Sequence, residues 1–428
     1  MQTEARCLFV EGGHKLKGEV VVSGAKNAAL PALAAALLAP GEYQFFNIPW
    51  LLDVQTMLEL LCRLGAQYET TNTALFLDTS QAKDVVAPYD IVSRMRASVL
   101  VLGPLLARYG RARVALPGGC PIGKRPIDFH LKGLELMGAK IHQEHGYIMA
   151  RAPRKGLSGA EIIFDFPSVT ATENLMMAAT LARGQTIIRN AAKEPEIVAL
   201  GEMLIKMGAK IRGLGTETIF IEGVKDLSAT EVSIIPDRIE AGTYLMAPGI
   251  AGGEVVVKNA NPHHLETVIA TLRKIGLKIE IDGDKIHSQK GRHLKPVKVR
   301  TAPYPGFPTD LQAQVMALLS TVKGTSVVIE NVFENRFLHV EELRRLGAQI
   351  TVEGRVAVIE GVRKLQAAPV KATDLRASAS LVLAALGAEG VTEISDIYHL
   401  KRGYEAICEK FNGIGAKVWE APCQHHLS

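Results

Sequence analysis

The sequence is poor in the features that mark nucleic-acid-binding proteins. Aromatic residues make up 5% of its 428 residues, and the net charge of +5 is not gathered into long runs of lysine and arginine. A nucleic-acid groove needs stacking surfaces and a basic stripe, so no nucleic-acid partner is expected. The charge instead favours a local site for a small anion.

Cysteine is also scarce. The five cysteines are odd in number, widely scattered and without a CxxC pair; they are Cys7, Cys62, Cys120, Cys408 and Cys423. This spacing predicts neither a disulfide framework nor a zinc site, and it suits a reducing cytosol.

Long apolar runs are missing. The run 28–39 is shorter than the roughly 18 residues that a membrane-spanning helix needs, and it contains Pro31. Glu4, Arg6 and Glu11 interrupt the N-terminus where a signal peptide has an apolar stretch. We therefore expect a cytoplasmic protein without a membrane segment, either a monomer or a weak oligomer.

What the sequence does contain is a repeat. A short phrase centred on glycine recurs at Gly65, Gly138, Gly208, Gly276, Gly347 and Gly415, with spacings of 73, 70, 68, 71 and 68 residues. A period of this length indicates a repeated supersecondary unit. Each glycine follows an amphipathic stretch such as 131–137 and precedes alternating residues such as 210–212. This pattern predicts a helix that ends at the glycine, followed by a strand.

A second helix, rich in small residues, is predicted in every repeat. The six stretches are 28–38, 95–107, 171–182, 239–250, 310–321 and 375–386. Helices that are apolar on nearly all sides are buried. We therefore place these helices inside and the strands, such as 255–258 and 326–330, outside. Pro248 and Gly249 are expected to shorten or kink the fourth inner helix.

Three repeats per lobe is the natural division, because one repeat cannot bury its own apolar face. The sequence thus predicts an α/β protein with two lobes. One lobe comprises 26–235, and the other comprises 1–25 with 236–428, so that the break falls near Ile235 and Pro236. A cleft between two similar lobes is where a small-molecule active site is expected.

A loop rich in glycine and proline, 116–126, surrounds Cys120. Cations such as Lys124 and Arg125 lower the pKa of a neighbouring thiol, which could then act as an acid or a nucleophile. The alternative is an inert thiol in a turn.

Two more candidates lie where inner helices are predicted to begin. Lys26 could bind an anion at a helix N-terminus, or could be a solvated residue at the helix start. Asp310 could accept a proton from a sugar hydroxyl, or Thr309 and Asp310 could simply cap the helix. His130 is interpreted as a loop or helix-start residue rather than a base.

Several arginines lie at the edges of apolar helices. Taken singly each is an ordinary surface residue, but arginine pairs with carboxylates and phosphates through two parallel hydrogen bonds. A converging set would suit a substrate that carries both groups. The set is Arg96, Arg125, Arg336, Arg376 and Arg402.

Together these motifs resemble the UDP-N-acetylglucosamine 1-carboxyvinyltransferases of the enolpyruvyl transferase family, over essentially the whole chain. The segments that carry the resemblance are 23–30, 116–125, 236–240, 300–314, 333–339, 372–380 and 398–404. The resemblance implies a two-lobed inside-out α/β barrel, which agrees with the six repeats. It also implies transfer of the enolpyruvyl group of phosphoenolpyruvate to the 3-hydroxyl of UDP-N-acetylglucosamine, the first committed step of peptidoglycan synthesis, without a metal or organic cofactor.

The resemblance also assigns roles to residues. Lys26, Arg125 and Arg402 would hold phosphoenolpyruvate, Cys120 would protonate its methylene carbon and form a covalent adduct with it, and Asp310 would deprotonate the sugar hydroxyl. The implied substrate-binding set is Lys26, Asn27, Arg96, Arg125, Asp128, Phe129, His130, Ser168, Val169, Thr170, Asp237, Asp310, Glu334, Arg336, Asp374 and Arg376.

The chain departs from the family pattern at three positions. Thr170 stands where the family often has glycine, Phe166 stands where some members have lysine, and Pro121 follows Cys120 where a small residue is commoner. These departures bear on affinity and loop stiffness more than on the type of reaction.

Two other functions compete with this one. A 5-enolpyruvylshikimate-3-phosphate synthase shares the repeat and phosphoenolpyruvate but lacks a Gly-Gly-Cys loop, which this chain has at 118–120. A catalytically silent binder of UDP-sugars would have lost Cys120, Asp310, Lys26 or Arg402, and all four are present.

Overall fold

The computed structural model describes residues 6–117 and 127–424. The chain divides into two compact units, which we describe separately. Unit 1 combines the N-terminal residues up to Ser23 with the chain from Pro236 onward, and unit 2 is formed by the chain between Gly24 and Ile235. Cys120, Pro121 and Arg125 lie outside the described residues.

Within the described residues, each unit contains three four-stranded sheets with one common pattern. In every sheet the first two strands are parallel, and the remaining two pairs are antiparallel. The six sheets correspond to the six repeats, so the α/β repeat predicted from the sequence is confirmed.

The strands of unit 2, in sheet order, are β14 (Glu231–Ser233), β3 (Glu42–Phe46), β5 (Ala74–Asp78) and β4 (Gln67–Thr70); β6 (Val86–Ala87), β7 (Arg111–Ala115), β9 (Tyr147–Arg151) and β8 (Lys140–Glu144); and β10 (Glu161–Ile163), β11 (Gln185–Arg189), β13 (Thr218–Glu222) and β12 (Lys210–Arg212). Alternate residues face the core, as Ile219 and Ile221 of β13 do. One face of each sheet is therefore buried.

The strands of unit 1, in sheet order, are β2 (Leu16–Val21), β15 (Gly253–Lys258), β17 (Lys285–Gln289) and β16 (Lys278–Asp282); β18 (Lys298–Arg300), β19 (Gly324–Ile329), β21 (Val356–Gly361) and β20 (Gln349–Glu353); and β23 (Pro369–Lys371), β25 (Val391–Ser395), β1 (Arg6–Glu11) and β26 (Lys417–Pro422). A short pair, β22 (Leu365–Gln366) and β24 (Ala388–Glu389), is added to them.

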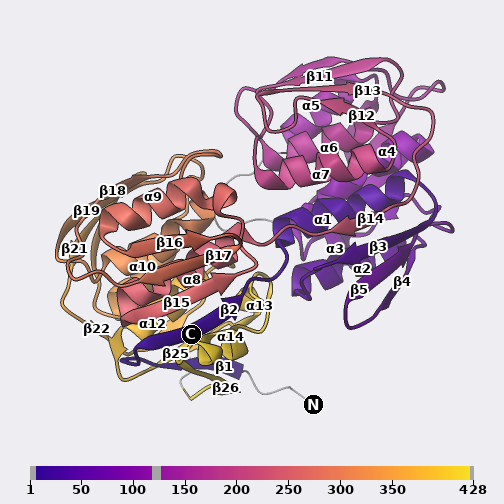
Figure 1. The fold of residues 1–428 in the computed structure, drawn as a ribbon. Coiled ribbons are helices and arrows are strands. Elements are labelled where there is room, and N and C mark those ends of the chain that lie inside the picture. Colours follow the sequence, from indigo (N-terminus) through magenta and orange to yellow (C-terminus); the bar gives the residue numbers. More distant parts are fainter. Residues whose placement is uncertain (1–5, 118–126, 425–428) are drawn as a thin grey trace. The chain divides into compact units, whose positions relative to one another are not determined.

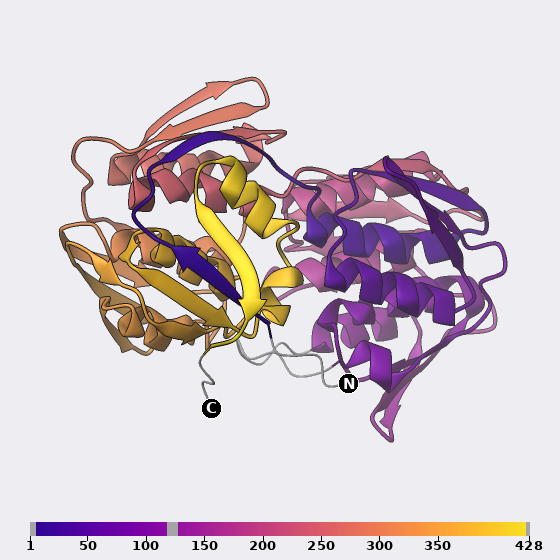
Figure 2. The same ribbon diagram turned by 90° about the horizontal axis from the view of Figure 1, so that it is seen from below.

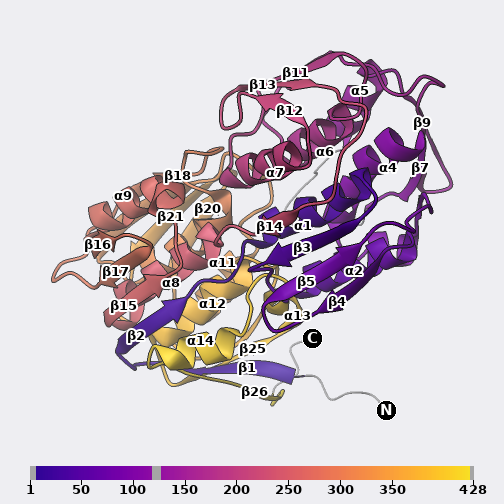
Figure 3. The ribbon, with the colours of Figure 1, turned by 45° about the vertical axis from the view of Figure 1, so that its right-hand side comes forward.

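The inner helices lie where the sequence predicts them. They are α1 (Lys26–Ala35) with η1 (Ala36–Leu38), η2 (Arg96–Val101) with α4 (Leu102–Tyr109), α6 (Val169–Ala179), α8 (Arg238–Ala251), η4 (Thr309–Leu311) with α10 (Gln312–Leu319), and α12 (Ala377–Leu386). All residues of α12 are buried. In unit 1, α8, α10 and α12 pack against one another, and in unit 2 α6 contacts both α1 and α4 (Figures 1 and 3).

The outer helices are α2 (Leu52–Arg63), α5 (Asp128–Leu136), α7 (Pro195–Lys206), α9 (Glu266–Ile275), α11 (His339–Arg345) and α14 (Ile407–Gly413), with shorter turns at α3 (Tyr89–Val92), η3 (Pro262–Leu265) and α13 (Tyr398–Lys401). The repeated glycine follows each of the six longer helices with a positive φ, from 87° at Gly415 to 112° at Gly276. These glycines end the helices in the left-handed conformation, as predicted.

One prediction about an inner helix is wrong in part. Pro248 does not shorten α8, which continues through it to Ala251. A proline inside a helix removes one backbone hydrogen bond. Here the whole helix from Ile239 to Ile250 is buried against its neighbours, and this packing outweighs the local preference.

The two ends of the described chain meet in one sheet of unit 1. β1 pairs antiparallel with β26, from Arg6 opposite Pro422 to Glu11 opposite Lys417, and Figure 2 shows the two strands side by side. The last repeat thus receives one of its four strands from the N-terminus. β2 similarly completes the sheet of the fourth repeat.

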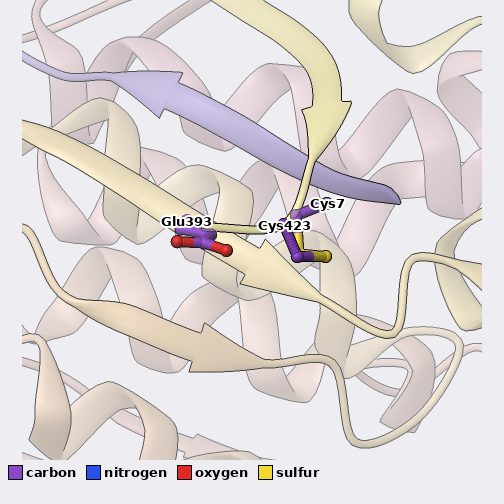
Figure 4. Close-up of side chains that lie close together, drawn as sticks. All are labelled: Cys7, Glu393 and Cys423. Atoms are coloured by element: carbon purple, nitrogen blue, oxygen red, sulfur yellow. A yellow bond between two sulfur atoms is a disulfide. The ribbon is translucent and has the colours of Figure 1, made fainter. Parts of the chain in front are cut away.

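A disulfide joins Cys7 to Cys423 across these strands, with 4.9 Å between the two Cα atoms (Figure 4). The expectation that the cysteines form no disulfide is therefore wrong, because two residues 416 positions apart become neighbours only in the folded sheet. The carboxylate of Glu393 lies beside them, with ligand atoms of all three within 4.8 Å of one another. Both sulfur atoms are taken up by the disulfide, so neither is a thiolate that could bind a metal.

Candidate active site

Six of the expected site residues lie where inner helices begin. Lys26 is the first residue of α1, Arg96 opens η2, Val169 opens α6, Asp237 precedes α8, Asp310 lies in η4 and Arg376 precedes α12. The first turn of a helix has backbone N–H groups without an intrahelical partner and a partial positive charge, which favour anions. Repetition of one supersecondary unit therefore supplies six such helix starts.

In unit 1 the carboxylate of Asp310 lies between two guanidinium groups. Nη2 of Arg336 donates to Oδ1 of Asp310 at 2.6 Å, and Nε of Arg376 is 3.6 Å from Oδ2. The two arginine side chains are only 6% and 4% exposed, whereas the side chain of Asp310 is 26% exposed. A carboxylate oriented on both oxygens but still accessible is suited to accept a proton from a bound hydroxyl.

Arg376 is buried beside a second carboxylate. Its Nη2 is 3.6 Å from Oδ2 of Asp237, and its guanidinium lies 5.6 Å from the ring centre of Tyr404. Burial alone would lower the pKa of Arg376, but Asp237, Tyr404 and Asp310 outweigh it and raise this pKa. Among the described residues neither terminal nitrogen of Arg376 has a hydrogen-bond partner. A fixed cation with unused donors is well suited to an anionic ligand.

Two aspartates of this cluster cap inner helices, but Asp310 does not. Asp237 accepts from the N–H groups of Ile239 and Glu240, and Asp374 accepts from those of Arg376 and Ala377. No side-chain cap is made at η4 or at α10. The capping interpretation of Thr309 and Asp310 is therefore wrong, and both side chains are directed to Arg336 instead.

His339 adds a buried imidazole to this part of unit 1. Neither ring nitrogen has a hydrogen-bond partner among the described residues. Burial lowers the pKa of His339, Asp374 opposes this shift and Arg336 adds to it, and together they bring the pKa to about 4. The imidazole is therefore neutral at pH 7.

Two further predicted residues, Arg402 and Glu334, also belong to unit 1. Arg402 directly follows α13, close enough to His399 for its charge, after burial, to lower the pKa of that histidine. Glu334 is exposed in the turn after β19.

In unit 2 Lys26 is buried. Its Nζ donates to Oδ2 of Asp53 in α2 at 3.1 Å, and the two side chains are 11% and 5% exposed. The interpretation of Lys26 as a solvated helix start is therefore wrong. Asp53 was missed in the sequence, because an acidic residue in the first turn of an outer helix has an ordinary local role.

His130 lies in the first turn of α5, as the sequence indicates. Its Nδ1 is 2.9 Å from the amide nitrogen of Asn174, and its Nε2 is 3.2 Å from the hydroxyl of Thr170. Thr170, one of the departures from the family pattern, thus orients this imidazole. Ser168 caps α6 by accepting from the N–H of Ala171.

The remaining predicted residues of unit 2 lie at the starts of the inner helix α1 and the outer helix α5. Asn27 follows Lys26 in α1, and Asp128, which is exposed, begins α5. Phe129 packs against Phe164 with 5.4 Å between the ring centres.

Among the described residues no helix is long and apolar enough to cross a membrane.

The model of the EPSP synthase family, described as 3-phosphoshikimate 1-carboxyvinyltransferase, matches residues 10–411. The chain belongs to the EPSP synthase family. A UDP-N-acetylglucosamine 1-carboxyvinyltransferase from Desulfosudis oleivorans is 55% identical to this chain over 411 residues. The match covers 96% of this chain and 98% of the relative.

Solved structures of the family share the fold. The enolpyruvyl transferase NikO from Streptomyces tendae has a TM-score of 0.88 and 25% identity, covering 98% of this chain and all of its own. An EPSP synthase from Acinetobacter baumannii has a TM-score of 0.75 and 18% identity, covering 97% of this chain and all of its own. The predicted enolpyruvyl transferase fold is therefore confirmed.

Proposed function

We propose that the protein transfers the enolpyruvyl group of phosphoenolpyruvate to the 3-hydroxyl of UDP-N-acetylglucosamine and releases phosphate. The observation that carries the proposal is the 55% identity, over 96% of the chain, to a relative named UDP-N-acetylglucosamine 1-carboxyvinyltransferase. The EPSP synthase is only 18% identical to this chain, so its likeness concerns the fold alone. Identity over nearly the full length of both chains favours the nucleotide sugar over shikimate 3-phosphate as the acceptor.

The charges of the described residues support this substrate pair. Phosphoenolpyruvate carries a carboxylate and a phosphate, and UDP-N-acetylglucosamine carries a diphosphate. Lys26 of unit 2 and Arg376 of unit 1 are buried cations at the starts of inner helices, and Arg336 is a buried cation paired with Asp310 in η4. Guanidinium groups bind such anions through two parallel hydrogen bonds, which orient as well as attract.

The reaction follows as an addition and an elimination. Asp310 takes the proton of the 3-hydroxyl while the oxygen of this hydroxyl attacks C2 of phosphoenolpyruvate. The thiol of Cys120 gives a proton to C3. The product of this addition is a tetrahedral ketal that carries the phosphate. Loss of a proton from C3 and of phosphate from C2 then restores the double bond. Because the addition and the elimination involve no net transfer of electrons to or from another molecule, the steps require no redox cofactor.

The remaining predicted residues keep the roles that the family resemblance implies. Arg125 and Arg402 are proposed to join Lys26 in binding phosphoenolpyruvate. The Cys120 thiol would also form the covalent adduct with phosphoenolpyruvate and react with the alkylating phosphonate fosfomycin. His130 and Thr170 would lie at the nucleotide sugar.

We place this step in peptidoglycan synthesis, and hence in cell-wall formation, growth and division. Both substrates are cytoplasmic metabolites, so the protein is proposed to act in the cytoplasm, as a monomer or weak oligomer, without a membrane or nucleic-acid partner. In a reducing cytosol Cys7 and Cys423 would be held as thiols, and the disulfide would form on oxidation.

A competition between acceptors tests the proposal. The purified protein is given phosphoenolpyruvate with equal amounts of UDP-N-acetylglucosamine and shikimate 3-phosphate, and the products are identified by mass spectrometry. An enolpyruvyl ether on the nucleotide sugar alone is expected. The proposal would fail if shikimate 3-phosphate were modified, or if a folded protein modified neither acceptor.

A further inference from the structure

The side chains behind Asp310 form a continuous chain of hydrogen bonds that begins at a carboxylate the reaction does not use. Glu330 directly follows β19 and is 1% exposed. Its Oε1 accepts from the hydroxyl of Thr301 at 2.9 Å and from the backbone N–H groups of Val332 and Phe333 at 2.8 and 3.0 Å. Its Oε2 accepts from the hydroxyl of Thr309 at 2.9 Å.

The direction of every hydrogen bond in this chain is determined by the groups involved. A carboxylate only accepts, so Thr309 must donate its single proton to Glu330. A guanidinium only donates, so the lone pair of Thr309 must accept from Nη1 of Arg336, at 2.9 Å. Nη2 of the same guanidinium donates to Oδ1 of Asp310 at 2.6 Å. The chain therefore runs from Glu330 through Thr309 and Arg336 to Asp310 with no alternative arrangement of protons.

Glu330 also orders the turn that carries an aromatic neighbour of Arg336. The guanidinium lies 5.1 Å from the ring centre of Phe333, whose backbone N–H is bonded to Glu330. One buried carboxylate thus orders both the hydroxyl that accepts from Arg336 and the turn that carries its aromatic neighbour. Arg336 and Asp310 belong to different elements, the turn after β19 and η4, and Glu330 ties these elements together.

We propose that Thr309, held by Glu330, is a positioning residue for the proton-accepting carboxylate of Asp310. It acts through Arg336 and touches neither substrate. The inference rests on the proposed function, because it concerns the orientation of the proposed base. A partly buried hydroxyl that accepts from a guanidinium limits the rotation of that guanidinium. Correct orientation of a proton-accepting group contributes to the rate of the chemical step.

The test replaces Thr309 by valine, which keeps the shape of the side chain but removes the hydroxyl. We expect kcat to fall between about 10- and 100-fold, while KM for UDP-N-acetylglucosamine changes less than about threefold. Thr309→Ser keeps the hydroxyl and should restore kcat to within about threefold of the wild type. A role in packing alone would not produce this split or this rescue.

Thr325→Val is the matched control. The Thr325 hydroxyl bonds to Glu360 at 2.8 Å between β19 and β21 on the exposed surface of the same unit, so the variant also removes a hydrogen bond from threonine to glutamate. It should leave kcat unchanged. Circular dichroism and the thermal midpoint establish that each variant is folded.

The possible results separate the inference from the proposed function. Wild-type kcat in Thr309→Val, or equal losses in the valine and serine variants, would overturn the positioning role if Asp310→Ala is inactive in the same assay. Should Asp310→Ala turn over normally, or the wild-type protein release no phosphate, the proposed function itself would fail.

Discussion

At the scale of single residues, the carboxylate of Asp310 combines access with restraint. Arg336 and Arg376 approach its two oxygens, and both are almost completely buried. The side chain of Asp310 is nevertheless 26% exposed, so a substrate hydroxyl can reach it. Buried cations that cannot move away can orient a partly exposed carboxylate, which is the arrangement that proton transfer to a bound substrate needs.

Replacement of Asp310 by alanine tests this arrangement. We expect Asp310→Ala to fold and to lose turnover by about 100-fold or more, because a positioned base contributes that much to a proton transfer. Steady-state phosphate release measures the loss. Asp282→Ala, an exposed aspartate at the end of β16, is the control and should retain full turnover. Turnover of Asp310→Ala near that of the control would exclude Asp310 as the base.

The buried imidazole of His339 makes stability depend on pH. Its pKa is lowered by burial from the ordinary value of 6.5 to about 4, so the fold favours the neutral ring. This contribution is complete above about pH 6.5 and is lost as pH falls toward 4, by up to roughly 3 kcal/mol. Urea midpoints of His339→Gln should decline less over this range than those of the wild type. Parallel declines would contradict the assignment.

The sequence identifies residues whose type is unusual for their position more easily than residues that act through others. Asp310 and Arg376 stand out because charged side chains begin apolar helices. Glu330 does not, since a glutamate after a strand is common and its four donors are assembled only in the fold. Asp53 is hidden for the same reason, because its partner Lys26 belongs to another helix.

At the scale of helices and strands, glycine and alanine were the informative residues. The six glycines that follow outer helices all have a positive φ, which other residues adopt only with strain. Stretches rich in alanine predicted the inner helices because small side chains on all sides indicate burial. Pro248 misled the prediction, since its local effect is smaller than the packing of α8.

Gly276, after α9, is the sharpest test of these helix ends. It has a φ of 112°, and a Cβ there would lie 2.6 Å from the backbone oxygen of His293. Gly276→Ala should lower the free energy of unfolding by about 2 kcal/mol or more. Gly413→Ala, at an exposed helical position with no atom within 4 Å of the new Cβ, should be neutral or stabilise by up to about 1 kcal/mol. Equal urea midpoints for both variants would contradict this account.

At the scale of the whole molecule, the first and last described strands, β1 and β26, belong to the same sheet. The period of the glycines predicts six repeats from sequence alone. It cannot show that β1 and β2 complete the sheets of the last and the fourth repeat, because these pairings join distant residues. The disulfide between Cys7 and Cys423 was missed for this reason.

This disulfide predicts a redox-dependent stability. It closes a loop of several hundred residues, and a bond of this kind stabilises a fold by about 2–4 kcal/mol. Addition of a phosphine reductant should therefore lower the urea midpoint of the oxidised wild-type protein, but should not affect Cys423→Ser. Cys408→Ser, which changes a free cysteine, should keep the dependence on reductant. A wild-type midpoint that ignores the reductant, with Cys7 and Cys423 alkylated as thiols, would show that the bond does not form.

The central claim is that the protein is an enolpyruvyl transferase that uses a nucleotide sugar as acceptor. Its most direct test is the rate of phosphate release from phosphoenolpyruvate with UDP-N-acetylglucosamine, with shikimate 3-phosphate and without an acceptor. We predict release with UDP-N-acetylglucosamine alone. Release with shikimate 3-phosphate, or a folded protein that releases no phosphate with either acceptor, would contradict the claim.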